Sequence, residues 1–183
     1  MSDAPPEGQQ NQSPAKKQEN LHPATQMRIL SQYVRDLSFE NPDAPHNLTD
    51  FSNKDPKIDV QINVNGRRLA ETDYTIDLKI EVTAKSGDSS KGTNTFFMVE
   101  LVYGGLFRLI NVPEDALQQV IMVECPRHLF PYARRVLADA VRDGGFPPVM
   151  LDPVDFGQLY ASRVKHDTVN TPEPSHINGS GTV

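Results

Sequence analysis

The segment from Thr95 to Tyr103 constrains the fold of this 183-residue chain most, because it is apolar on both of its alternating sides. Glu100 is its only charged residue. A strand points successive side chains to opposite faces of a sheet, and a strand with two apolar faces needs cover on both. Helices of the same chain can cover one face. The other face then requires a second subunit or an apolar ligand.

Three other segments alternate as strands do. Lys57 to Asn65 and Tyr74 to Thr83 place apolar side chains on one face and mostly polar ones on the other. Met27 to Phe39 is also predicted as a strand. One side of it is then formed by Ile29, Ser31, Tyr33, Arg35, Leu37 and Phe39.

Turn residues indicate how these strands are joined. Asn65-Gly66 can form a tight turn, but the next strand begins only near Thr72, so a longer loop is also open. Gly104-Gly105 interrupts the last strand, and Leu106 to Val112 resumes it. A bulge or a close backbone approach explains this glycine pair better than phosphate binding. Residues 41–56 read as a long surface connection, and such loops tend to be functional.

Helices follow the strands in the chain. Pro113 suits a first helical position, and the acids that follow it suit the positive end of a helix dipole. Gly144-Gly145 ends a second helix, and Phe146-Pro147-Pro148 reads as an extended connector. The predicted helices cover residues 113–124, 126–143 and about 153–164. Strands first and helices afterwards predict an α+β fold, with an antiparallel sheet and helices packed on one face.

Composition predicts one domain between two tails. Residues 1–22 and 166–183 are rich in Pro, Gln, Asn, Ser and Gly, and we expect both to be disordered, leaving a domain over residues 23–165. The net charge of −6 disfavours nucleic acid and anionic membrane surfaces as partners. We find no signal peptide and no membrane span. Cys125 is the only cysteine, which excludes an internal disulfide and favours the cytoplasm.

A search for catalytic chemistry finds little. There is no phosphate-binding loop, no Gly-x-Ser-x-Gly elbow and no paired-histidine zinc helix. Cys125 and His128 could face one side of a helix, but a metal site needs more ligands, so we expect a buried cysteine and a surface histidine. Asp36 and Glu40 would lie about 13 Å apart on one face of a strand. That separation is wide for a shared proton and fits a docking patch or a solvated acidic face.

Four separated segments resemble the protein-export chaperone family SecB, in the same order and at similar spacing. The resemblance covers roughly residues 27–165. The segments are YVRDLSFENPDAPH (33–46), VELVYGGLF (99–107), ECPRHLFPYAR (124–134) and GGFPPVMLDPVDFGQLY (144–160).

The resemblance implies a four-stranded antiparallel sheet with helices on one side, in a homotetramer built as a dimer of dimers. Such proteins hold unfolded secretory precursors without ATP or any cofactor and pass them to the export motor SecA. The positions that match the family's SecA contacts are Asp36, Glu40, Met98 and Glu100. The acidic ones would attract the basic, zinc-bearing tail of SecA, whose zinc belongs to that partner.

The resemblance also implies an aromatic groove for clients and a subunit interface. The residues that match the groove are Tyr33, Phe51 and Phe156, although the long loop over residues 41–56 lacks the tryptophan of the better-known pattern. Val99, Leu101 and Tyr103 match positions that support subunit packing, on the strand face opposite Met98 and Glu100.

Two other functions stay open on the sequence. One is a SecB-like chaperone dedicated to a single partner, such as a toxin and antitoxin pair. The other is a small oligomeric enzyme whose site forms between subunits, in which Cys125 and His128 would be the residues to test.

Overall fold

Four long strands form one antiparallel sheet in the order β1-β4-β3-β2. The structure is a computed structural model, and it describes residues 24–51, 56–86 and 95–169. The strands are β1 (Gln26–Glu40), β2 (Lys57–Arg68), β3 (Asp73–Lys85) and β4 (Thr95–Ile110). The helices are α1 (His46–Asp50), α2 (Glu114–Gln119), the π-helical turn η3 (Val120–Glu124), α3 (Cys125–Asp143) and α4 (Phe156–Val169). The predicted α+β class is confirmed.

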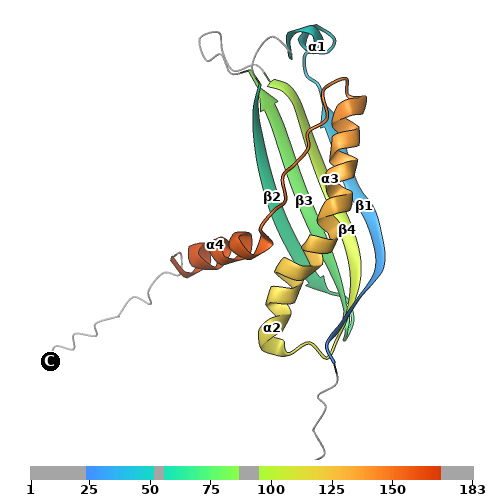
Figure 1. The fold of residues 1–183 in the computed structure, drawn as a ribbon, viewed down its shortest axis with the longest axis vertical. Helices are drawn as coiled ribbons and strands as arrows, with labels where there is room; N and C mark the ends of the chain where they lie inside the picture. Colours follow the sequence, from blue (N-terminus) through green and yellow to red (C-terminus); the bar gives the residue numbers. More distant parts are fainter. Residues whose placement is uncertain (1–23, 52–55, 87–94, 170–183) are drawn as a thin grey trace, which may run out of the picture.

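The sheet has two different faces. On the inner face, helix α3 lies lengthwise over the middle strands (Figure 1), and the side chains of β3 and β4 beneath it are almost fully buried. No described helix covers the other face, which we call the outer face. Its side chains in these two strands are half-buried or exposed, apart from Gly104, Asp77 and Phe96, the last beside a register irregularity at the end of the strand. The alternation of β4 therefore assigns Leu101 to the core and Glu100 to the open side.

The glycine pair does not interrupt the fourth strand, so that prediction is wrong. Strand β4 runs through it to Ile110 without a change of register against β3. A Cβ atom on Gly104 would come within 2.6 Å of the Tyr33 ring on the outer face. A Cβ atom on Gly105 would come within 2.7 Å of Leu129 of α3 on the inner face. The pair is needed because groups approach the backbone closely from both sides.

Strand β1 breaks its own alternation twice. Its register against β4 shifts between Ile29 and Ser31 and again between Val34 and Asp36. Each shift inserts one extra residue and turns the following side chains to the other face. The expectation that Tyr33 and Leu37 share one side of the strand is therefore wrong. Tyr33 pairs with Gly104 on the outer face, whereas Leu37 pairs with Leu101 on the inner face.

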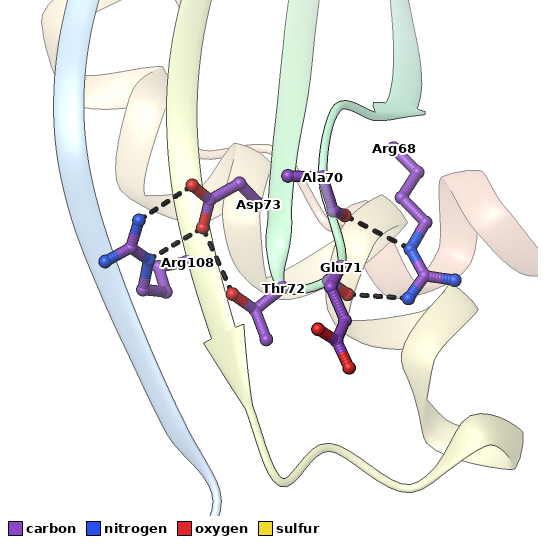
Figure 2. A network of polar contacts seen from close by, with 6 residues as sticks. All are labelled: Arg68, Ala70, Glu71, Thr72, Asp73 and Arg108. Atoms are coloured by element: carbon purple, nitrogen blue, oxygen red, sulfur yellow. Dashed lines mark hydrogen bonds and ion pairs between the residues drawn. The ribbon is translucent and has the colours of Figure 1, made fainter.

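The turn between β2 and β3 lies beyond Asn65-Gly66. Both residues stay in β2, and the chain reverses over residues 69–72. Arg68 closes this loop by donating from Nε to the carbonyl of Ala70 (3.2 Å) and from Nη2 to that of Glu71 (2.6 Å), as Figure 2 shows. In the same view, Arg108 of β4 binds both carboxylate oxygens of Asp73, at 2.7 and 2.8 Å. Neither predicted loop is formed, because β2 continues through Asn65-Gly66 to Arg68 and only residues 69–72 make the turn.

The two helices predicted over 113–124 and 126–143 form one continuous helical segment. Pro126 has no N–H for the i−4 bond of a regular α-helix, and the π-helical turn η3 widens the helix directly before it. Gly144 then ends α3, as predicted, and no regular structure is found over residues 147–155. The connector was thus predicted correctly.

Helix α4 begins later and runs further than predicted. The Asp155 carboxylate accepts a hydrogen bond from the Gln158 N–H (3.0 Å), which caps the first turn. The helix continues to Val169, past the boundary at residue 165 that we set for the tail. Arg163 ties it to β2 by donating to the carbonyl of Val64 and to Asn63 Oδ1, both at 2.8 Å. Residues 1–22 and the rest of the C-terminal tail lie outside the described residues.

The edge strands keep apolar side chains that this chain does not bury. Helix α3 packs on the middle of the inner face, so the inner-facing residues of β1 and β2, apart from the buried Val64, are only partly covered. We call these two strips the β1 flank (Ile29, Val34, Leu37) and the β2 flank (Ile58, Val60); their members are 38–46 % exposed. Two apolar strips on one small sheet indicate contact with other polypeptides.

Candidate functional site

The outer face gathers acidic side chains from three neighbouring strands. Directly paired residues of antiparallel strands point to the same side, so the register defines cross-strand rows. Three successive rows, taken in the order β1, β4, β3, are Glu40–Met98–Thr83, Ser38–Glu100–Glu81 and Asp36–Val102–Lys79. The four predicted SecA-contact residues therefore all lie within this patch, which we call the acidic patch.

Glu81 and Lys79 extend the acidic patch beyond the sequence prediction. The Lys79 ammonium lies 3.0 Å from Glu100 Oε1 and 3.1 Å from Glu81 Oε1. Hydrogen bonds to Glu100 and Glu81 raise the pKa of Lys79 above its ordinary value, so its charge is secure at neutral pH. The alternation of β3 already placed both residues on one face, but only the register brings Glu81 opposite Glu100.

A hollow of about 170 Å³ opens within the acidic patch. Glu40, Glu81 and Glu100 line it, and Met98 supplies an exposed apolar side chain. Its full lining is Ser38, Glu40, Glu81, Val82, Thr83, Met98, Val99 and Glu100. Such a hollow suits a basic segment that also carries an apolar side chain.

The opposite end of the outer face is basic. Arg28 and Arg108 are paired across β1 and β4, and Arg67 lies nearby on β2. Hydrogen bonding to Arg108 holds the pKa of the Asp73 carboxyl below its ordinary value. Between the two ends, Arg35 forms an ion pair with Asp77. The outer face thus changes sign along its length, which gives a docking partner a preferred direction.

The predicted interface residues Val99, Leu101 and Tyr103 do not reach the surface of the protomer. They are at most 8 % exposed, on the inner face. The alternation correctly separated them from Met98 and Glu100, but helices of the same chain cover them. We therefore correct the prediction of a direct subunit contact at these residues. Helices of the same chain can cover one face of a strand, and here they do.

The three residues predicted for the client groove are not brought together. Tyr33 lies on the outer face over Gly104 because of the β1 register shifts. Phe156 is 1 % exposed and packs edge-on against Phe130, at 5.9 Å between ring centroids, so it belongs to the core. Phe51 is half-buried in a cluster with Phe96, Phe97 and Phe146. Of the three, only Tyr33 and Phe51 present any surface to a client.

Sequence reasoning missed a larger groove between α3 and the following connector. Its volume is about 400 Å³, and its lining is Pro131, Arg134, Arg135, Ala138, Asp139, Arg142, Pro148 and Met150. Met150 is 61 % exposed and offers an apolar side chain to this groove. The sequence offered one indication of it, the extended connector with its two prolines. A segment that runs beside a helix without regular secondary structure can leave a groove between the two.

The Cys125 and His128 pair forms no shared site. The Cys125 thiol is buried 3.8 Å from the sulfur of Met27, whereas His128 is exposed. Burial and the nearby Glu124 raise the pKa of Cys125 to about 12, so the thiol stays protonated at neutral pH. No cluster of three or more metal-ligating side chains occurs among residues 24–51, 56–86 and 95–169. None of the described helices has the length and apolar composition needed to span a bilayer.

The fold is that of a SecB-like chaperone. A solved structure of such a chaperone from Mycobacterium tuberculosis, in complex with a peptide from the HigA1 antitoxin, superimposes with a TM-score of 0.58. The match covers 70 % of this chain and 90 % of that one, at 13 % sequence identity, so it concerns the fold alone.

Sequence comparison is more specific. The family model for the preprotein translocase subunit SecB matches residues 18–167. The protein-export protein SecB of Azorhizobium caulinodans is 49 % identical over 161 residues, which are 88 % of this chain and 94 % of that protein. The SecB of a Bradyrhizobium strain is 50 % identical over 143 residues, 78 % of this chain and 85 % of that one. The chain belongs to the SecB family and is a protein-export chaperone, not an enzyme.

Proposed function

We propose that this chaperone holds unfolded secretory precursors in the cytoplasm, without nucleotide, and delivers them to SecA through the acidic patch. The observation that carries the proposal is the gathering of Asp36, Glu40, Met98 and Glu100 on one open sheet face. They come as two pairs from strands β1 and β4, which are far apart in the sequence, and they match the family's SecA contacts. A basic tail of SecA would meet carboxylates around a hollow that also offers the apolar Met98.

The same proposal includes assembly as a dimer of dimers. The β1 flank supports it, because Val34 and Leu37 lie exposed beside the free hydrogen-bonding edge of the sheet. An edge strand with apolar side chains favours pairing with a second chain. We assign an indirect role in assembly to Val99, Leu101 and Tyr103, because they form part of the buried sheet surface on which α3 packs.

Clients are assigned to the apolar surfaces that assembly at β1 leaves free. These are the β2 flank, with Phe51 beside the same end of the sheet, and the groove that Met150 lines. Extended apolar segments bind such surfaces without a fixed sequence code. Unfolded precursors are chains of this kind.

Glutamine substitutions in the acidic patch test the SecA contact. Glu40→Gln and Glu100→Gln each remove one negative charge at nearly constant shape. We expect each to weaken SecA binding about two- to tenfold at low ionic strength, mainly through slower association. Glu71→Gln is the matched control, because Glu71 lies in the β2–β3 turn at the other end of the sheet. Surface plasmon resonance with immobilised SecA measures all three, and equal binding by all variants contradicts the assignment.

A further inference from the structure

Lys79 is the only basic side chain in the three cross-strand rows that form the acidic patch. Asp36, Glu40, Glu81 and Glu100 supply the negative charges of these rows. The Lys79 ammonium lies between two of them, at hydrogen-bonding distance from Oε1 of both Glu81 and Glu100. Arg35, the extra residue of the second β1 register shift, is paired with Asp77 and so is directed away from the patch.

The pairing of Glu81 with Glu100 explains why a cation is needed there. The two glutamates are direct cross-strand partners, and like charges placed directly opposite one another destabilise a sheet. Lys79 precedes Glu81 by two residues and therefore stands on the same face of β3. Its ammonium offsets the repulsion and holds both carboxylates toward one point.

The contact is also open to exchange. The side chains of Lys79, Glu81 and Glu100 are 36–37 % exposed, and ion pairs at such exposure contribute little to stability. A cation from outside can therefore replace the Lys79 ammonium at small cost. Glu81 and Glu100 also line the hollow of the patch, so a docking segment reaches them there.

We propose that Lys79 is an internal counter-ion that occupies the place of a partner's basic side chain and thereby limits the affinity of the acidic patch. Docking of a basic segment displaces Lys79 from Glu81 and Glu100, and the ammonium swings into solvent on its flexible stem. Lys79 thus keeps binding reversible, which suits a chaperone that must release its partner. This inference rests on the proposed docking of SecA at the acidic patch.

Removal of the internal cation should tighten binding. Lys79→Gln is expected to bind SecA about two- to fivefold more tightly at low ionic strength, with a steeper loss of affinity as salt is added. Lys79→Arg retains the charge and should return affinity toward the wild-type value. Arg127→Gln removes one positive charge that is also paired with a glutamate, but on helix α3 at the other side of the sheet, and should leave affinity unchanged.

The double variant Lys79→Gln/Glu81→Gln is the control for an effect of Lys79→Gln on folding. It removes the opposed glutamate pair and restores the original net charge of the patch, so it should bind SecA less tightly than Lys79→Gln. Affinities come from titrations at two ionic strengths, with thermal unfolding recorded for each variant. Weaker or unchanged binding by a folded Lys79→Gln overturns the inference about Lys79. Failure of the wild-type protein to bind SecA overturns the proposed function instead.

Discussion

At the scale of single residues, Gly104 shows how closely the outer face is packed. The Tyr33 ring covers it, so that even a methyl group would lie within 2.6 Å of a ring carbon. We expect Gly104→Ala to lower the free energy of unfolding by about 1–3 kcal/mol, because the ring must leave its place. Urea denaturation measures the change. In a Tyr33→Ala background the same substitution should cost much less, and an equal cost in both backgrounds would contradict the close contact.

The Cys125 thiol gives a pH-dependent prediction at the same scale. Its pKa rises from an ordinary value of 9.0 to about 12 on folding, so the native state favours the protonated form. The stabilisation is complete below pH 9 and is lost as the pH rises toward 12. We expect the stability advantage of the wild type over Cys125→Ala to shrink between pH 8.5 and pH 11, measured by urea denaturation at each pH. An advantage that stays constant over this range would refute the burial of the thiol.

At the scale of elements, alternation predicted strands β2 and β3 well. The strands around Ile62 and Leu78 were found because each places apolar side chains on one face and mostly polar ones on the other. The position of strand β1 in the sequence was predicted correctly, but the assignment of its side chains to the two faces of the sheet was not. Its two register shifts depend on pairing with β4, a long-range interaction that leaves no local pattern in the sequence.

The helices show the same limit. Pro126 reads as a helix start, and the sequence alone does not reveal that a π-helical turn carries the helix through this point. Gly104-Gly105 reads as a break for a similar reason, since glycine marks both interrupted strands and close approaches. Only the positions of Tyr33 and Leu129 decide between these two meanings.

The candidate site was predictable in part. The alternation of β4 placed Met98 and Glu100 on one face, and the family resemblance added Asp36 and Glu40. Neither source indicated Glu81 or Lys79, because their contribution depends on the register of β3 against β4. The burial of Val99 and Phe156 was missed because an apolar strand or helix residue is equally suited to a core and to an interface.

At the scale of the whole molecule, the sheet is wider than the helices that cover it. Figure 1 shows α3 along the middle strands, and the exposed apolar residues of β1 and β2 lie to either side of it. On the inner face, the uncovered apolar surface is thus on the edge strands, not around Leu101 in the centre. A protein with two such strips is expected to associate with itself and with other apolar chains.

The most direct test of this account is the mass of the protein in dilute solution, alone and mixed with a chemically unfolded secretory precursor, measured by light scattering after size exclusion without ATP. The account predicts four chains of 20.4 kDa each, about 82 kDa in total, and a larger complex once the precursor is added. A single 20.4 kDa species that leaves the precursor to aggregate would contradict it.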